Sequence, residues 1–307
     1  MANSHINGWI IFDKPLGLGS TQAVAAVKRN LRQAGFGKVK VGHGGSLDPL
    51  ATGVLPIALG EATKLAGRML DASKVYEFTI AFGAETDTLD LEGAVIARSD
   101  HRPSLGEIEA MLPRFTGPIE QVPPAYSALM IDGVRAYDRA RAGEDVAMPR
   151  RAVEIYSLST LPFWGKDGLS EISLTTHVSK GTYIRSLARD IARALGTVGH
   201  VTMLRRTRAG PFPLERAISL DNLNAIGQGA ALENVILPLE AGLDDIPALT
   251  LGPEQARAVR EGRVLTGLAF QDGVCWARYG NTPVALMQVD GGNATVLRGF
   301  NLPDVAE

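Results

Sequence analysis

The apolar and polar positions along this chain follow two periodicities, which predict helices and strands. Alternation, or short apolar runs between turn-forming residues, predicts strands over residues 8–12, 75–82, 152–161 and 169–178. Apolar residues three and four apart predict helices over residues 20–33, 61–70, 104–112, 181–196 and 253–261, with one more after residue 219. Because strands and crossover helices do not alternate regularly, the pattern favours an α+β fold with a mixed, largely antiparallel central sheet flanked by helices.

Turn-forming and helix-capping residues refine these elements. Ser20 with Thr21, Ser104 and Ser219 stand where helix N-caps are expected, and Gly196 is a typical helix stop. The stretch 41–53 is rich in glycine and contains a proline, so we expect an irregular loop there.

The pattern of apolar positions and glycines changes near residue 247. Short strand-like pieces separated by glycines follow, which is typical of a small β-barrel-like module. We therefore predict two domains, residues 1–245 and residues 246–307.

Composition fits an ordinary globular protein, with 307 residues, 45% hydrophobic and 21% charged. No apolar run approaches the roughly 18 residues of a membrane span, and the start lacks the pattern of a signal peptide. Cys275 is the only cysteine, and the five histidines lack metal-ligand spacing. We expect a cytoplasmic protein with no metal and no cofactor.

The formal net charge of −2 does not suggest a nucleic-acid-binding protein, but the distribution of charge is uneven. Residues 14–47 contain basic side chains and no acidic one, whereas residues 217–256 contain acidic side chains and no lysine or arginine. Further basic clusters lie at residues 135–151 and 205–208. Charge alone leaves two interpretations open: RNA-binding faces, or solvated helix faces.

The loop at residues 42–53 offers candidate chemistry. Asp48 precedes Pro49, which favours an extended backbone at the aspartate, and the neighbouring glycines allow close approach of another backbone. The loop lacks the Gly-Lys-Ser/Thr ending of a phosphate-binding P-loop. Taken alone, Asp48 is either a catalytic carboxylate or part of an exposed turn.

Residues 42–55, continuing through Gly60-Glu61-Ala62-Thr63-Lys64, resemble the signature of the TruB-type tRNA pseudouridine-55 synthases. Further blocks occur in the family's order: Gly8-Trp9 with Asp13-Lys14-Pro15, Lys74-Val75-Tyr76, Thr86-Asp87-Thr88-Leu89-Asp90, Gln121 to Ala128, Ser179 to Leu187 and Leu204-Arg205-Arg206. The resemblance covers residues 8 to about 210, and the C-terminal segment more loosely resembles a PUA domain, an RNA-binding β-barrel.

The resemblance implies an isomerase that breaks the N1–C1′ bond of a T-loop uridine, rotates the uracil and joins C5 to C1′. It implies that Asp48 is the catalytic carboxylate and that Arg185 pairs with it, which would favour its ionised form. It also implies that Tyr76 stacks on the target base and takes a proton from C5. Whether Asp48 first attacks C1′, adds to C6 or removes a ribose proton stays open.

The resemblance implies further substrate contacts. Tyr183 and Leu204 would border the uracil, and His43 would occupy the gap left by the flipped base. Lys14 and Lys64 are expected to contact the RNA backbone or to be structural. The run that contains Arg205 and Arg206 would suit phosphates, with one of its arginines buried in a hydrogen-bond network. Asp87 and Asp90 are expected to support the active site rather than to act as a glycosidase-like carboxylate pair.

The chain departs from the family pattern at three places. Gly44 and Ser46 stand where the family often has threonine and alanine, which is expected to loosen the loop. Met130 replaces a lysine, which removes a charge that could touch RNA, and Val178 replaces a cysteine.

Three roles remain open for the chain. It is an enzyme acting on the T-arm and T-loop of tRNA, a tRNA-folding chaperone, or the catalytic subunit of a guide-RNA pseudouridylation particle. The intact Asp48, Tyr76 and Arg185 favour the enzyme over a chaperone that has lost catalysis. No long extension for partner subunits is evident, so we expect a monomer without an obligate protein partner or membrane contact.

Overall fold

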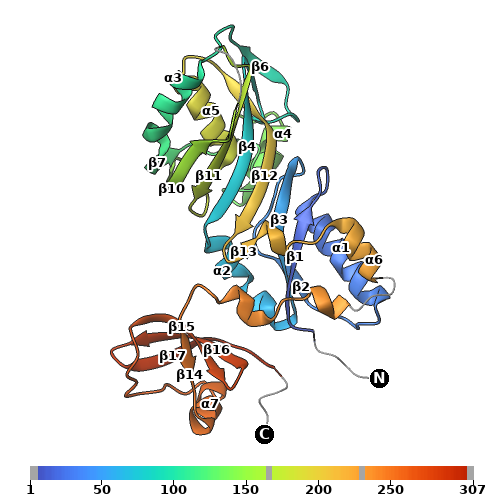
Figure 1. The fold of residues 1–307 in the computed structure, drawn as a ribbon, viewed down its shortest axis with the longest axis vertical. Coiled ribbons are helices and arrows are strands. Elements are labelled where there is room, and N and C mark those ends of the chain that lie inside the picture. The colour runs from blue at the N-terminus through green and yellow to red at the C-terminus, as the bar shows by residue number, and fades with distance from the viewer. Residues whose placement is uncertain (1–5, 164–167, 228–231, 303–307) are drawn as a thin grey trace. The chain divides into compact units, whose positions relative to one another are not determined.

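The computed structural model of the chain describes residues 6–163, 168–227 and 232–302, which form two compact units (Figure 1). The first unit consists of Met1–Asp48, Val54–Leu70 and Gly210–Glu307. The second consists of Pro49–Gly53 and Asp71–Ala209. The chain therefore leaves the first unit directly after Asp48 and returns to it after Gly53.

The first unit begins with strands and helices around one buried tryptophan. Its strands up to residue 242 are β1 (Gly8–Lys14), β2 (Val41–His43), β3 (Ala51–Leu59, of which residues 54–59 belong to this unit) and β13 (Phe212–Pro213). Its α-helices are α1 (Ser20–Gln33), α2 (Ala66–Asp71, of which residues 66–70 belong to this unit) and α6 (Leu220–Gly227). Its 3-10 helices are Gly60–Leu65, Leu214–Arg216, Leu232–Val235 and Leu239–Gly242. Trp9 of β1 is fully buried, stacks obliquely on Phe212 at 5.2 Å between ring centroids, and donates from Nε1 to the Leu239 carbonyl at 3.0 Å. Remote parts of the sequence are thus joined at β1.

The C-terminal part of the first unit has its own sheet and apolar cluster. Its elements are β14 (Ala248–Thr250), α7 (Pro253–Arg260), β15 (Gly273–Tyr279), β16 (Thr282–Asp290) and β17 (Asn293–Gly299), and the strands pair in that order. Cys275, Ala285 and Met287 are fully buried among them. This confirms a C-terminal module of short strands. The PUA-like detail and the boundary at residue 245 stay predictions, and residues 303–307 lie outside the described part.

The second unit is a mixed sheet with helices packed beside it (Figure 1). Its elements are β4 (Lys74–Phe82), β5 (Ala84–Thr86), β6 (Val95–Arg98), α3 (Leu105–Met111), the 3-10 helix Leu112–Phe115, β7 (Gly117–Gln121), β8 (Met130–Ile131), β9 (Val134–Arg135), α4 (Ala136–Arg141), β10 (Arg151–Thr160), β11 (Glu171–Val178), α5 (Ile184–Ala194) and β12 (Gly199–Ala209). The start of β3 pairs parallel to β12, and the order continues antiparallel through β4, β11, β10 and β7. The predicted α+β fold with a largely antiparallel sheet is confirmed.

Alternation along β4 explains the core of this unit. Phe78, Ile80 and Phe82 point to one face and are buried, as the period of two predicts. They pack with the apolar stripe of α5, in which Leu187 and Ile191 are fully inaccessible. Burial of such a face contributes roughly 25 cal/mol per Å² of apolar surface, so the sheet and α5 stabilise each other.

Several predicted boundaries shift in the structure. The stretch 41–53 is irregular only from Gly44 to Leu50, because β2 and β3 pair on either side. The predicted helix 61–70 begins as a 3-10 helix, and the helix predicted from residue 181 begins at Ile184, because Gly181 adopts a left-handed φ of 77° in the preceding turn. Arg185 is therefore the second residue of α5.

The N-cap predictions have mixed outcomes. Ser104 caps α3 by accepting from Glu107, and Ser219 accepts from the Asn222 amide at the start of α6. The prediction for Ser20 was wrong, because Gly19 occupies the cap position of α1. The Ser20 hydroxyl bonds to the backbone of Leu47 instead.

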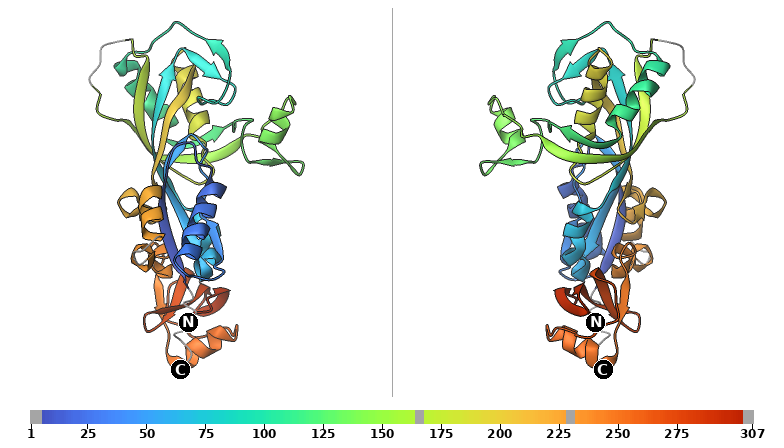
Figure 2. Two further views of the ribbon diagram at one scale, coloured as in Figure 1. Left: turned by 90° about the vertical axis from the view of Figure 1, so that its right-hand side faces the viewer. Right: turned by 90° about the vertical axis from the view of Figure 1, so that its left-hand side faces the viewer.

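One segment of the second unit projects from its sheet. β8, β9 and α4 form a green arm that extends to one side in both views of Figure 2. It carries Arg135, Arg139 and Arg141, and it exposes Met130, which is 58% accessible. The predicted basic cluster of residues 135–151 thus begins on a projecting element.

Candidate functional site

Asp48 lies in a loop of the first unit whose backbone is held by neighbouring elements. The Gly44 amide donates to the Pro56 carbonyl at 2.8 Å, which closes the β2–β3 hairpin just before the loop. Leu47 is buried, Asp48 is half-buried and Pro49 is exposed. The aspartate therefore stands between a buried anchor and a proline that favours extended backbone.

Gly44, one departure from the family pattern, is packed rather than loose. A Cβ at this position would lie 2.5 Å from Cβ of Met69, a distance that side chains do not adopt. Gly44 is buried against α2, so the expectation of a loosened loop is not supported at this residue. Ser46 is exposed, and His43 is half-buried and pairs with Ile57 of β3.

Arg185 is anchored by two segments of the second unit, the turn at residues 86–90 and the stretch that contains Tyr126. Its Nη1 donates to the Thr88 carbonyl at 2.7 Å, and its Nη2 donates to the Tyr126 carbonyl at 3.0 Å. Nη1 also lies 3.5 Å from Oδ2 of Asp90, and both side chains are less than a tenth exposed. A planar guanidinium held at these points has a fixed orientation, so Arg185 is a rigid cation and not a solvated helix charge.

The Asp87–Asp90 turn is shaped to hold this arginine. The Asp90 carboxylate accepts from the Thr88 hydroxyl at 2.5 Å and from the Glu92 amide at 3.0 Å. Leu89 has a left-handed φ of 64°, and its carbonyl accepts from the Val201 amide of β12. These contacts agree with a supporting role for Asp90, and the corresponding role of Asp87 stays a prediction.

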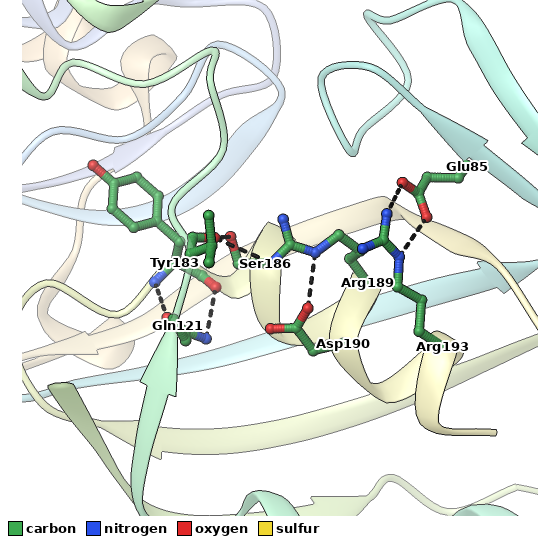
Figure 3. Close-up of polar contacts among 8 residues, drawn as sticks. Glu85, Gln121, Tyr183, Ser186, Arg189, Asp190 and Arg193 are labelled. Carbon is green, nitrogen blue, oxygen red and sulfur yellow. Dashed lines mark hydrogen bonds and ion pairs between the residues drawn. The ribbon is translucent and has the colours of Figure 1, made fainter. Parts of the chain in front are cut away.

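Tyr183 is oriented by a side chain that the sequence analysis did not single out. Gln121 accepts from the Tyr183 amide at 3.1 Å and donates to its carbonyl at 3.3 Å, while the tyrosine ring extends away from α5 (Figure 3). Ser186 and Arg189 both donate to the Val122 carbonyl, which fixes the start of α5 to the segment after β7. A lone glutamine has no pattern that would have revealed this role.

Arg193 and Glu85 form a further contact of α5. The Arg193 guanidinium binds Glu85 through two nitrogens, at 2.6 and 3.1 Å, and Arg189 pairs with the adjacent Asp190 at 2.8 Å (Figure 3). The helix that carries Arg185 is thus tied along its length, which limits how far Arg185 can move.

Tyr76 and Leu204 share one face of the sheet. Arg206 pairs with Tyr76 and Leu204 pairs with Phe78 across β12 and β4, and paired residues of antiparallel strands point to the same face. Tyr76 and Leu204 are both partly buried and pack against the same apolar cluster. The structure therefore brings these two predicted base contacts to a common surface.

The arginines of β12 divide between the two faces. Arg206 is 1% exposed, so it is the buried arginine that the sequence analysis anticipated, and direct contact with RNA does not fit its position. Arg205 points the other way, is half-buried, and donates to the Thr52 hydroxyl at 3.3 Å.

Two lysines expected to contact the RNA backbone or be structural have structural contacts. Lys14 is fully buried, and its ammonium donates to the carbonyls of Leu18 and Pro15 at 2.6 and 3.1 Å. Lys64 pairs with Glu61 at 2.6 Å and donates to the Gly299 carbonyl at 2.9 Å. These contacts favour the structural alternative for both.

Lys74 is a buried lysine close to Tyr76 in the sequence. Burial, with smaller contributions from the cations Arg206 and Lys180 and an opposing effect from Asp71, lowers the pKa of its ammonium to about 8. Its Nζ donates to the Ala72 carbonyl at 2.5 Å. His177, which lies 3.1 Å from the Arg208 guanidinium, also has a lowered pKa because of burial and that cation.

The chemistry that these residues can perform involves a carboxylate, aromatic rings and a fixed cation. The sequence analysis predicts that Asp48 supplies a nucleophile or base, that Tyr76 and Tyr183 supply rings, and that Arg185 supplies the cation. Asp48 belongs to the first unit and the other three belong to the second.

Among the described helices, none is long and apolar enough to cross a membrane.

Comparison with known proteins identifies the family. Residues 29–184 match the model of the TruB family pseudouridylate synthase N-terminal domain, and residues 185–244 match the tRNA pseudouridylate synthase B C-terminal domain. The relatives named tRNA pseudouridine synthase B include one from Novosphingobium aromaticivorans, 71% identical over 98% of this chain and 100% of the relative. Another, from Zymomonas mobilis, is 57% identical over 96% of each chain.

Solved structures agree with this assignment. A chain of an H/ACA ribonucleoprotein bound to a substrate RNA containing 2′-deoxyuridine has a TM-score of 0.73 and 26% identity, over 98% of this chain and 87% of that one. A chain of an archaeal box H/ACA complex has a TM-score of 0.71 and 25% identity, over 97% and 87%. From sequence motifs, family models and relatives together, the chain belongs to the TruB family of pseudouridylate synthases.

Proposed function

We propose that this protein is a tRNA pseudouridine synthase that isomerises the T-loop uridine. Relatives over the whole length of the chain are named tRNA pseudouridine synthase B, and they include one from Caulobacter vibrioides at 44% identity over 97% of each chain. The observation that carries the proposal is the Asp48–Pro49 loop, which has a buried anchor before the aspartate and a paired strand after it.

The covalent chain keeps Asp48 near one predicted base contact. Ala51, three residues after Asp48, pairs with Leu204 on the parallel strands β3 and β12. Three peptide steps span at most about 11 Å, so the Cα atoms of Asp48 and Ala51 cannot be further apart than that. This limit supports a role for Leu204 beside the nucleoside on which Asp48 acts.

In the proposed reaction, the ionised Asp48 acts on the nucleoside in the first step. The N1–C1′ bond breaks, the uracil rotates, a C5–C1′ bond forms, and the proton on C5 is lost while N1 gains one. Atoms and electrons balance without a co-reactant. Tyr76 stacks on the base and takes the C5 proton, and Arg185 favours the charged form of the carboxylate.

The remaining contacts have distinct roles. Tyr183 and Leu204 border the uracil, and His43 fills the space of the flipped base, whose extrusion costs a few kcal/mol. Arg205 contacts phosphate. Lys14, Lys64 and Arg206 hold the protein structure around the site instead of touching RNA.

The test uses tRNA labelled with tritium at uracil C5, followed by mapping of pseudouridine. Wild-type protein is expected to release tritium and to place pseudouridine in the T-loop, and Asp48→Asn is expected to do neither. Near-normal release by Asp48→Asn would contradict the assignment of this carboxylate.

A guide-RNA particle is the alternative that the solved relatives suggest, because those chains belong to H/ACA ribonucleoproteins. The purified chain alone should modify an unmodified T-arm hairpin if it acts as a stand-alone enzyme. A strict requirement for added guide RNA would favour the particle. A tRNA-folding role can be tested separately from catalysis. Promotion of tRNA folding by the Asp48→Asn protein would show such a role.

A further inference from the structure

Ser20 and Leu47 form a buried contact that joins α1 to the loop of Asp48. The Leu47 amide donates to Oγ of Ser20 at 2.9 Å, and the same hydroxyl donates to the Leu47 carbonyl at 3.0 Å. Ser20 and Leu47 are each only 7% exposed. One side chain therefore satisfies both backbone groups of a single residue, away from competing water.

This contact fixes the peptide from which Asp48 projects. The Leu47 carbonyl lies in the same planar peptide unit as the Asp48 amide, so holding that carbonyl sets the plane on the N-terminal side of Asp48. Pro49 restricts the backbone of Asp48 on the C-terminal side. The backbone of the aspartate is thus constrained from both directions.

The position of Ser20 makes the constraint rigid. Ser20 is the first residue of α1, a helix of 14 residues whose buried face includes Ala23, Val27 and Leu31. A side chain at the first turn of a long, packed helix moves little, so it transmits the position of α1 to the loop. Ser20 does not cap α1, because Gly19 is the N-cap residue. The Gly19 amide donates to the Gln22 side chain at 2.7 Å.

We propose that Ser20 is a positioning residue for catalysis, which acts by fixing the Leu47–Asp48 peptide. The proposal rests on the proposed function, because it assumes that Asp48 is the reacting carboxylate. A displacement of about 1 Å in a reacting group can cost on the order of 10²-fold in rate, whereas RNA contacts elsewhere keep their geometry. The expected signature is therefore a loss in kcat with little change in KM.

The test compares Ser20→Ala with Thr21→Val, which removes a hydroxyl from the next residue, an exposed one. Single-turnover and steady-state tritium release, tRNA affinity by filter binding and melting temperature are measured for both. Ser20→Ala should lower kcat about 10- to 100-fold and change KM and tRNA affinity less than about twofold. Thr21→Val should behave like the wild type.

Ser20→Cys keeps a weaker donor and acceptor and guards against a failure of the alanine variant to fold. Its kcat should lie between those of the serine and alanine proteins. Equal kcat in wild type, Ser20→Cys and Ser20→Ala would overturn the proposal, as would a loss confined to melting temperature or to tRNA affinity. An inactive wild type would instead show that the proposed function has failed.

Discussion

At the scale of single residues, Arg185 shows how a surface-like charge becomes part of a rigid site. Its guanidinium contacts Thr88, Tyr126 and Asp90, which belong to two segments far from α5 in the sequence. A lysine could not reach the two carbonyls and the carboxylate together, because its ammonium is a single point charge. Its planar fork of donors is therefore what the site requires.

Arg185→Lys should thus lower kcat at least tenfold and reduce the free energy of unfolding by about 2–4 kcal/mol, since buried acceptors lose partners. Tritium release and urea unfolding measure the two effects. Arg257→Lys is a control on another helix, because the Arg257 side chain is 76% exposed and its partner Glu261 is 48% exposed. That control should keep kcat within about twofold and lose about 1 kcal/mol. Equal losses of activity in both variants would contradict a special role for Arg185.

Lys74 predicts a dependence of stability on pH. At neutral pH its ammonium is protonated in both folded and unfolded chains, and burial makes that charge costly in the folded state. Between about pH 8 and 10.5, the ordinary pKa of a lysine, the folded protein has lost this proton while the unfolded chain still holds it. The Lys74 contribution to the free energy of unfolding therefore rises with pH, by at most about 1.4 kcal/mol per pH unit.

Lys74→Met removes this rise. Urea unfolding at pH 7.5 and pH 9.5 should show wild type gaining stability relative to Lys74→Met at the higher pH. Lys28→Met, at an exposed lysine of α1 that does not contribute to the Lys74 shift, serves as a control and should follow the wild type. A constant difference between wild type and Lys74→Met at both pH values would count against the buried titration.

At the scale of elements, the pairing of β3 with β12 depends on one glycine. Gly53 has a left-handed φ of 99°, and a Cβ there would lie 2.2 Å from the Arg206 carbonyl oxygen. Neither the backbone angle nor the space admits a side chain, so Gly53 sets how closely the two strands approach.

Gly53→Ala should lower the free energy of unfolding by about 3 kcal/mol or more. The strained backbone angle of the alanine and the steric clash of its Cβ with the Arg206 carbonyl both destabilise the folded state. Gly67→Ala is a contrasting change in α2, where an added Cβ would have no neighbouring atom within 4 Å in the described part of the chain, apart from the helix's own backbone. It should leave stability unchanged or raise it by about 0.5–1 kcal/mol. Similar melting temperatures for the two variants would show that β3 can relax around residue 53.

The elements that the sequence predicted well are those whose burial follows a simple period. β4 and the apolar stripe of α5 alternate or repeat as expected, and Ser104 with Glu107 forms the predicted cap. β12 was not predicted, because its three arginines give this central strand the pattern of a polar segment: Arg205, Arg206 and Arg208. The burial of Arg206 depends on neighbours from β4, which no local pattern contains.

The site shows the same division. Asp48 and Arg185 were predicted as site residues through the family resemblance, because the local pattern around Asp48 is ambiguous by itself. Ser20 was predicted as a helix cap because local preference favours it, yet its hydroxyl bonds to a residue 27 positions away. Gln121 likewise acts through a contact with Tyr183, 62 positions distant. Long-range hydrogen bonds of this kind leave no periodic signal.

At the scale of the whole molecule, local charge matters more than the net charge of −2. The acid-free stretch from Lys14 to Leu47 places exposed cations on one end of α1 and on the segment after it. A hollow of the first unit there is lined by both apolar and basic side chains, with the lining residues Lys28, Leu31, Arg32, Phe36, Gly37, Lys38 and Val39. Such a surface suits the phosphates and bases of RNA better than a neutral protein partner.

Affinity for tRNA should therefore fall as salt rises, with a slope of log affinity against log salt that counts phosphate contacts. Lys38→Gln removes one cation from the lining of the hollow and should reduce the magnitude of that slope by about 1. Lys40→Gln makes the same chemical change two residues away, outside the lining of the hollow, and should leave the slope closer to that of the wild type. Filter binding of tRNA between about 50 and 200 mM salt measures all three slopes. Identical slopes for wild type and Lys38→Gln would exclude the hollow as part of the RNA-binding face, and the basic side chains there would then be solvated helix charges.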